Sequence, residues 1–449
     1  MSERIQKALT RTTDTRYCLL QSGAIEKAGT FFKELFPGCG ALIVCDGNTW
    51  EAAGKAVLSS LKEAGVRMAE PKIFPSEGFY AEWRHIDALR QLLRGNDLIA
   101  VAVGSGVLND LSKLSSHLEG KRYMCVGTAA SMDGFTAYGA SITKDGNKQT
   151  FSCPAPLGFV MDPVIAADAP QGLSASGYGD LLAKIPAGAD WILADALKEE
   201  AIDTFAWDIL QGGLKDALSD PDGILSGDIT ATGLLSEGLL LSGFAMQAMH
   251  SSRPASGTEH QMAHYWDMEN LSYESGIHVS HGYKVAIGTL LSTAILEFLL
   301  QSDIQSVDEQ AAADQWPSWP MTVAFIHELL DGKPGHLSRC LEETKAKYAS
   351  RDEVKEQIRK LKSIWPLLKE KIRGQIIPFD QVRDMLQKAG APYEPEMIGV
   401  SREHLRETFL AMPYMRSRYT AIDAVHRLGL MRGLEDHLFG RHGIWSIQK

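Results

Sequence analysis

The chain has 449 residues, so two or three domains are expected at ~150 residues per domain. Hydrophobic residues make up 45% of the sequence and charged residues 22%, which excludes a disordered, collagen-like or low-complexity protein. The formal net charge is −11 and no stretch is dominated by lysine and arginine, which disfavours a nucleic-acid-binding protein. An anionic ligand must therefore be held by local groups.

Strand and helix patterns alternate along the first part of the chain. Short apolar, often β-branched runs predict strands at residues 41–46, 66–74, 98–104, 123–128 and 157–163. Helical spacing of apolar residues predicts helices between them, at residues 49–64, 79–94 and 107–118. This alternation predicts a Rossmann-like, nucleotide-binding α/β domain with a parallel sheet and helices on both faces.

Helical patterns replace the strand patterns beyond Pro170. The predicted helices are residues 179–200, 203–218, 231–250, 260–270, 281–300, 321–330, 351–371, 379–388 and 402–412. Pro186 is expected to kink or split the first of them, because proline cannot donate a helical hydrogen bond. The most apolar stretches, 233–249 and 285–300, are shorter than the ~20 residues of a membrane span and contain a glutamate each. Both are expected to be buried helices and not membrane spans.

These patterns divide the chain into an α/β nucleotide-binding domain at residues 1–168 and an all-helical domain at residues 169–449. The six cysteines show no CxxC spacing, which excludes a zinc ribbon and fits a reducing compartment. The N-terminal segment MSERIQKALTRTTDTRY contains no apolar run, so a secretory signal is not expected. We expect a cytoplasmic protein.

A glycine-containing motif, GSGVLND at residues 104–110, follows the clearest predicted strand. Glycines let the backbone approach a pyrophosphate, and free N–H groups at a helix N-terminus bind its charge. The motif departs from the GxGxxG fingerprint, because Asn109 replaces the third glycine and the loop follows the third predicted strand. A tight strand-to-helix turn explains it equally well.

Two further strand ends carry polar side chains. The motif TAASMDG at residues 128–134 offers two hydroxyls and a carboxylate, and ligands of open α/β sheets bind outside the carboxyl ends of the strands. Asp46 ends the first predicted strand, where an adenosine ribose is read in such folds. Solvated turns remain the alternative for both segments.

Five of the 13 histidines lie within 32 residues, and they are His250, His260, His264, His278 and His281. His260 and His264 are four residues apart, so they share one face of a helix. Two histidines and a carboxylate from elsewhere make a three-ligand metal site with an open position. Asp180 is a candidate carboxylate, although a carboxylate at a helix start is more often a cap.

Taken in order, these motifs resemble the iron-containing alcohol dehydrogenase and dehydroquinate synthase superfamily, and within it the bacterial sn-glycerol-1-phosphate dehydrogenases. The segments that carry the resemblance are GSGVLND (104–110), TAASMDG (128–134), GYGDLLAK (177–184), DWILA (190–194), SGTEHQMAH (256–264), HGYKVAIGT (281–289), PEMIG (395–399) and RSRYTAIDAVHRLG (416–429). The resemblance spans nearly the whole chain. It implies a dehydroquinate synthase-like fold with the active site in the cleft between two domains.

The resemblance also implies roles for individual residues. The pyrophosphate of NAD(H) or NADP(H) would be bound by Gly104, Ser105, Gly106, Val107 and Leu108, and the nicotinamide ribose side would be lined by Thr128, Ala129, Ala130 and Ser131. Asp180, His260 and His281 would hold one divalent metal ion, either Zn, Ni or Fe. Asp133, Asp180 and His264 would contact the substrate and take part in catalysis.

Two positions depart from relatives of this kind. Some polyol-type members carry a histidine one turn after the motif aspartate as a fourth ligand, and Lys184 stands there. A family serine that contacts the cofactor is replaced by Ala137, with Thr136 and Tyr138 as neighbouring substitutes. The preference between NAD and NADP is therefore open.

The resemblance implies metal-dependent, reversible reduction of dihydroxyacetone phosphate to sn-glycerol 1-phosphate by NAD(P)H. Lys184, Arg253 and Lys284 are the candidate partners of the substrate phosphate, and the family implies a homo-oligomer, expected to be a homodimer. One alternative is a dehydrogenase of an unphosphorylated polyol such as glycerol. Others are a dehydroquinate synthase-like lyase, disfavoured because such synthases have glutamate where Asp180 stands, and a nucleotide-binding regulatory protein with a degenerate site.

Overall fold

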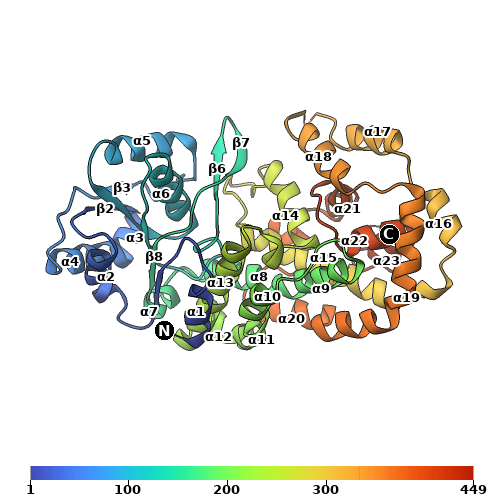
Figure 1. Ribbon diagram of the computed structural model, residues 1–449, viewed down its shortest axis with the longest axis horizontal. Coiled ribbons are helices and arrows are strands. Elements are labelled where there is room, and N and C mark those ends of the chain that lie inside the picture. Colours follow the sequence, from blue (N-terminus) through green and yellow to red (C-terminus); the bar gives the residue numbers. More distant parts are fainter. Residues whose placement is uncertain (1, 333, 448–449) are drawn as a thin grey trace. The chain divides into compact units, whose positions relative to one another are not determined.

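The computed structural model describes residues 2–332 and 334–447 of the chain (Figure 1). Its strands are β1 (Tyr17–Leu20), β2 (Gly40–Asp46), β3 (Lys72–Phe74), β4 (Leu98–Gly104), β5 (Met124–Gly127), β6 (Ala140–Lys144), β7 (Asn147–Phe151) and β8 (Gly158–Met161). The helices among these strands are α1 (Glu3–Leu9), η1 (Ile25–Lys27), α2 (Ala28–Leu35), α3 (Gly47–Thr49), η2 (Trp50–Gly54), α4 (Lys55–Glu63), α5 (Trp83–Leu93) and α6 (Gly106–Leu118).

Helices make up the regular structure that follows β8. They are α7 (Pro163–Ala167), α8 (Gln171–Leu182), α9 (Lys184–Leu197), α10 (Thr204–Gln211), α11 (Leu214–Ala217), α12 (Pro221–Ser226), α13 (Ile229–Met249), η3 (Arg253–Ala255), α14 (Thr258–Met268), α15 (His281–Gln301), η4 (Ile304–Ser306) and α16 (Glu309–Gln315). The remaining ones are α17 (Trp319–Leu329), α18 (Pro334–Lys347), α19 (Arg351–Gln375), α20 (Phe379–Lys388), η5 (Pro395–Ile398), α21 (Arg402–Ala411), η6 (Met412–Tyr414), α22 (Ala421–Arg427) and α23 (Met431–Phe439). The predicted fold class, an α/β part followed by a helical part, is confirmed.

The main sheet has six strands in the order β1-β8-β5-β4-β2-β3, and each neighbouring pair is parallel. Strand β4 is central and its sequence LIAVAVG is buried after Leu98, as a strand covered on both faces requires. The predicted strand at 66–74 is shorter than expected, since only Lys72–Phe74 form β3 and Met68 adds an isolated parallel bridge to Ala41. The other four predicted strands are confirmed within a few residues.

Two strand features were not predicted. The edge strand β1 pairs only along four residues with β8, too short a run for a periodicity argument. A two-stranded antiparallel sheet, β6 and β7, follows β5 (Figure 1). Its turn is Asp145-Gly146, and both residues have positive φ, 51° and 76°, as a two-residue hairpin turn requires. That dipeptide is the signal that predicts the hairpin.

Pro186 splits the first predicted helix of the helical part. Helix α8 ends at Leu182 and α9 begins at Lys184. Proline has no N–H to donate to the carbonyl of Leu182, four residues earlier, so a single continuous helix would lack that bond. The break places Asp180 in the last turn of α8 rather than at a helix start, which removes its interpretation as an N-terminal cap.

The two most apolar stretches form long helices, α13 and α15, that are long and apolar enough to cross a membrane. Within the structure, 72% of the apolar window of α13 and 83% of that of α15 are buried. Apolar helices with such burial are core helices of the fold, as the sequence predicts.

The chain forms two compact units. One contains Met1–Leu181, Thr204–Pro254 and Lys388–Ala391, and the other contains Leu182–Asp203, Ala255–Gln387 and Pro392–Lys449. The boundary predicted between residues 168 and 169 does not separate these units but divides the strand-containing part from the helical part. Strand β8 ends at Met161 and is the last strand in the described part of the chain.

Candidate metal and nucleotide site

The loop between β4 and α6 exposes backbone donors for an anion. Ser105 is the N-cap residue of α6, but its side chain makes no capping hydrogen bond to that helix. Its hydroxyl instead lies 2.6 Å from the hydroxyl of Ser131. The first-turn N–H groups of this 13-residue helix therefore have no side-chain cap from Ser105, and uncapped helix N-termini are common binding sites for phosphate groups.

The two predicted cofactor loops lie next to each other. Gly104 pairs with Gly127 across β4 and β5, and the N–H of Thr128 donates to the carbonyl of Gly104 at 3.2 Å. The structure thus brings residues 104–108 and 128–131 to one edge of the sheet, where their donors and hydroxyls can line a single nucleotide site.

Gly177 explains why the second loop packs against α8. A Cβ at this position would lie 1.9 Å from the carbonyl oxygen of Ala130, so only glycine permits this approach of the two backbones. Three residues further on, the Oδ2 of Asp180 accepts a hydrogen bond from the N–H of Asp133 at 3.0 Å. The loop that carries the nucleotide-binding candidates therefore also orients the carboxylate of Asp180.

The carboxylate of Asp133, the predicted substrate contact, accepts a hydrogen bond from the hydroxyl of Ser242 on α13 at 2.8 Å. The side chain of Lys113 on α6 is fully buried, and its Nζ donates to the carbonyls of Gly134, Ala137 and Gly139 at 3.1, 2.9 and 3.0 Å. These contacts fix the backbone that follows Asp133. Neither Ser242 nor Lys113 was predicted, because both come from elements distant in sequence.

The hydroxyl groups of Thr136 and Tyr138, the two neighbours of Ala137, are the candidates to replace the family serine. Thr136 is fully buried and its hydroxyl donates to the carbonyl of Leu240 at 2.9 Å. Tyr138 is 41% exposed and its ring packs edge-on against His250. The hydroxyl of Thr136 is therefore engaged in the fold, while Tyr138 faces outward.

Asp46 has a structural role that competes with ribose binding. Its carboxylate caps α3, since Oδ1 accepts the N–H of Thr49 at 2.8 Å, and the Thr49 hydroxyl accepts the N–H of Asp46 at 3.0 Å. This reciprocal pair is a capping box.

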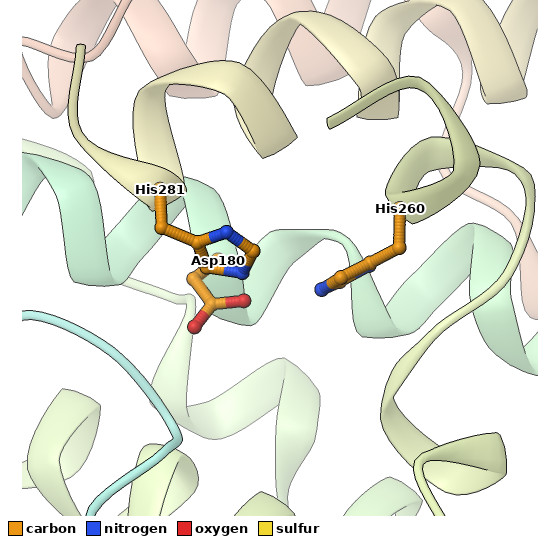
Figure 2. Close-up of side chains that lie close together, drawn as sticks. All are labelled: Asp180, His260 and His281. Atoms are coloured by element: carbon orange, nitrogen blue, oxygen red, sulfur yellow. The ribbon is translucent and has the colours of Figure 1, made fainter. Parts of the chain in front are cut away.

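The structure brings the three predicted metal donors together (Figure 2). The candidate ligand atoms of Asp180, His260 and His281 lie within 4.8 Å of one another. Figure 2 shows both imidazole rings and the carboxylate turned toward a common space. Asp180 is fully buried and His260 is 7% exposed. Two imidazole nitrogens and one carboxylate oxygen suit Zn²⁺ or a similar divalent transition metal and leave coordination positions open.

Close packing of two helices positions the histidine pair. A Cβ at Gly288 on α15 would lie 2.5 Å from the backbone oxygen of Glu259 on α14, so glycine allows these helices to approach. The first residue of α15 is His281, and its ring centroid lies 5.4 Å from that of His260. The start of α14 is held by Asp190, whose carboxylate accepts the N–H of Thr258 at 2.7 Å.

Glu259 fixes the orientation of His260. The Oε1 of Glu259 lies 2.8 Å from the Nδ1 of His260 and 2.6 Å from the N–H of Gly257. Full burial raises the pKa of the Glu259 carboxyl to about 7. With Nδ1 donating to the carboxylate, Nε2 of His260 is the atom left for a metal. Glu259 lies in the segment SGTEHQMAH that carries the family resemblance, but no role was predicted for it.

His264 faces a different set of partners. Its Nε2 lies 2.9 Å from Nη2 of Arg416, and its Nδ1 lies 4.0 Å from a carboxylate oxygen of Asp267. Burial, followed by the charge of Arg416, lowers the pKa of His264 well below its ordinary value. A neutral ring that accepts from the guanidinium carries its proton on Nδ1. His264 is not among the three clustered donors.

The three cations proposed for the substrate phosphate are buried. Lys184 and Arg253 have no exposed surface, and Lys284 is 4% exposed and forms an ion pair with Asp267. The two other histidines of the sequence cluster also have local contacts. His278 bonds the hydroxyl of Ser272 at 2.9 Å, and His250 ends α13 in the left-handed conformation.

All six cysteines are free thiols. Burial raises the pKa values of five of them, which are Cys18, Cys45, Cys125, Cys153 and Cys340. Such thiols are poor nucleophiles and metal ligands, so they belong to the core rather than to a reactive site.

Comparison with known proteins places this arrangement in a family. Residues 19–170 match the profile of the iron-containing alcohol dehydrogenases. The chain is 34% identical to the NAD(P)+ glycerol-1-phosphate dehydrogenase of Halalkalibacterium halodurans over 56% of this chain and 64% of that protein. It is 31% identical to the enzyme of the same name from Geobacillus thermodenitrificans, over 65% of this chain and 74% of that protein. The chain belongs to the glycerol-1-phosphate dehydrogenase group of the iron-containing alcohol dehydrogenase family.

The match to the first of these relatives spans less than two thirds of its length, 64%. The fold as a whole matches the crystal structure of glycerol dehydrogenase from Schizosaccharomyces pombe, with a TM-score of 0.59 at 16% identity. That match covers 95% of this chain and 90% of the yeast protein, which extends the shared fold well beyond residues 19–170.

Proposed function

We propose that this chain is a metal-dependent oxidoreductase that reduces dihydroxyacetone phosphate to sn-glycerol 1-phosphate with NAD(P)H, and catalyses the reverse reaction. The observation that carries the proposal is the grouping of Asp180, His260 and His281 within 4.8 Å, in a chain related to glycerol-1-phosphate dehydrogenases. A phosphate-binding helix start and a transition-metal donor set are the two parts that such a reaction needs.

The donor chemistry fits a divalent metal ion, either Zn, Ni or Fe. Asp180 is oriented by the N–H of Asp133 and His260 by Glu259, so two of the three donors have partners that hold them. The first turn of α6 fits the pyrophosphate of NAD(H) or NADP(H), with Thr128, Ala129, Ala130 and Ser131 on the nicotinamide ribose side and Asp46 near the adenosine. When bound, the metal supplies Lewis acidity toward the substrate carbonyl and the nicotinamide supplies hydride.

The chain's own residues orient the substrate and move its proton. Asp133, held by Ser242, is assigned to a substrate hydroxyl. His264 is assigned to the substrate as well, and it delivers the proton of the new hydroxyl directly or through a water molecule that it orients. Since its neutral ring carries the proton on Nδ1, Nε2 can deliver a proton only after Arg416 releases that nitrogen and Nε2 takes up a proton from water.

We also propose a cytoplasmic enzyme with a small-molecule substrate and no nucleic-acid partner. The support is the set of six free thiols and the net charge of −11. A homo-oligomer, specifically a homodimer, is proposed by analogy with the family.

The decisive experiment measures NADH and NADPH oxidation by the metal-loaded protein with dihydroxyacetone phosphate. Parallel assays use dihydroxyacetone, the oxidation of glycerol, and phosphate release from the dehydroquinate synthase substrate. Turnover of the phosphorylated ketone that is lost on chelation and restored by Zn²⁺, Ni²⁺ or Fe²⁺ supports the proposal. Turnover of glycerol alone, or phosphate release, would assign one of the alternative reactions instead.

A further inference from the structure

A guanidinium contacts His264, on the helix that also carries the proposed metal donor His260. Arg416 follows η6, and its Nη2 lies 2.9 Å from Nε2 of His264. His264 shares its helix with His260, and the two ring centroids are 6.3 Å apart. The side chains of Arg416 and His264 are 30% and 32% exposed, so a small ligand can reach both.

Two further guanidinium groups lie near Arg416. Burial, with the nearby charges of Arg339 and Arg418, lowers the pKa of Arg416 to about 10. The carboxylate of Glu343 lies 4.0 Å from Arg416 and 3.8 Å from Arg339, so one carboxylate faces two of the guanidinium groups. Arg418 donates to the carbonyl of Ser256 at 2.7 Å. The positive charge of these guanidinium groups would attract a bound dianion.

The present partner of Arg416 is a weak acceptor for a guanidinium. A neutral imidazole offers one lone pair, whereas phosphate offers charged oxygens that match the two N–H groups of the fork. The other cations near the donors are less suitable, because Lys184 and Arg253 have no exposed surface and Lys284 pairs with Asp267. Arg416 is therefore accessible to a ligand, its guanidinium fork matches a phosphate group, and phosphate can replace its present partner His264.

We propose that Arg416 binds the phosphate group of the substrate, an inference that rests on the proposed reduction of a phosphorylated ketone. The phosphate replaces Nε2 of His264 as the acceptor for the guanidinium. That nitrogen is then released toward the reacting end of the substrate. Arg416 thus selects the phosphorylated ketone over its unphosphorylated analogue and couples phosphate binding to the position of His264.

The test compares Arg416→Gln with Arg416→Lys and with a control, Arg359→Gln, whose side chain lies on α19 and is 51% exposed. For Arg416→Gln, KM for dihydroxyacetone phosphate should rise on the order of 100-fold, the scale of a lost charged partner. KM for NADH should stay unchanged. The value of kcat/KM for dihydroxyacetone should not fall, because the variant no longer holds Nε2 of His264. KM of Arg416→Lys for dihydroxyacetone phosphate should lie between the values of the wild-type protein and Arg416→Gln. Lysine keeps the positive charge but lacks the two parallel N–H groups of the guanidinium.

A binding measurement separates this inference from the proposed reaction. Calorimetry with inorganic phosphate on the metal-loaded protein should show binding that Arg416→Gln loses and Arg359→Gln keeps. If the wild-type protein binds phosphate through Arg416 but does not reduce dihydroxyacetone phosphate, the reaction is wrong and the anion site stands. Wild-type protein without phosphate affinity, or a folded Arg416→Gln with wild-type KM and phosphate affinity, would overturn the inference.

Discussion

Glu259 and His260 are neighbours in sequence and partners in space, with Oε1 of the carboxylate 2.8 Å from Nδ1 of the imidazole. Adjacent residues on a helix ordinarily point in different directions. Here the carboxylate turns back at the start of α14 to accept the N–H of Gly257 as well. The pair therefore leaves Nε2 of His260 as the nitrogen available to a metal held with Asp180 and His281, in the manner of a carboxylate–histidine–metal triad.

Replacement of Glu259 by glutamine should weaken metal binding by ~10–100-fold, the usual effect of losing such an outer partner. The reason is that the amide is a weaker acceptor and leaves the ring of His260 less basic and less fixed. Competition between the apoprotein and a chromophoric chelator for Zn²⁺ measures the affinity directly, without reference to turnover. The exposed Glu342→Gln variant is the control, and equal Zn²⁺ affinities for both variants would contradict the role of Glu259.

His260 and His264 should respond differently to alanine substitution. His260→Ala removes one of the clustered donors, so the protein should lose its metal. His264→Ala should keep near-normal metal content and slow turnover by ~10²-fold or more, the scale of a lost general acid or base. Metal analysis of both variants, prepared in parallel, gives the answer. An empty His264→Ala protein would show that the two roles are reversed.

Gly106 provides a test of the nucleotide site. A Cβ there would meet the end of the Met132 side chain at 2.9 Å, a flexible contact, so Gly106→Val should fold. The added side chain stands at the first residue of α6 and should obstruct a pyrophosphate, raising Kd for NADH about tenfold or more, equal to ~1.4 kcal/mol. Fluorescence titration with NADH measures this, and Zn²⁺ affinity should not change.

The matched control is Gly374→Val, because a Cβ at Gly374 near the end of α19 has no neighbouring atom within 4 Å. If both valine variants bind NADH as tightly as the wild-type protein, the loop at residues 104–108 is a structural turn. If both lose affinity equally, the effect is not specific to the loop.

Much of the α/β part could be predicted because its strands are buried on both faces. Strand β4 reads as a continuous apolar run, and the helix after it begins where the glycine loop ends. Strand β1 and the β6–β7 hairpin escaped prediction for the opposite reason. The sequence of β1, YCLL, is too short to show a period, and this strand pairs with β8, far along the chain. The hairpin strands carry no clear period, so only the turn dipeptide Asp145-Gly146 marks them.

The histidine cluster by itself predicted a metal site, but its three donors could be assigned only through the family resemblance. Their sequence positions, 180, 260 and 281, do not indicate that the atoms converge. The approach of His260 to His281 depends on the close packing of Gly288 against Glu259, which pairs residues far apart in the pattern of apolar residues. The contact between His264 and Arg416 spans 152 residues, so local sequence patterns could not have predicted it.

His426 gives the stability of the chain a defined dependence on pH. Its ring packs 4.7 Å, centroid to centroid, from Trp316, and burial lowers the pKa of His426 to about 4. The unfolded chain takes up this proton near the ordinary value of 6.5, so between these values the unfolded state binds more protons. Stability must therefore fall as pH falls through this window, by about 2 kcal/mol between pH 7.5 and pH 5 from this residue alone.

Replacement of His426 by glutamine should remove that part of the pH dependence. Guanidinium unfolding of the chelated apoprotein at pH 7.5 and pH 5 measures it, because chelation removes the coupling between metal binding and protons. The wild-type protein should lose about 2 kcal/mol more than His426→Gln over this interval. The exposed His442→Gln variant is the control and should follow the wild-type protein, since its side chain lies at the surface. Parallel losses in the wild-type and His426→Gln proteins would show that the ring is protonated at no cost in the folded state.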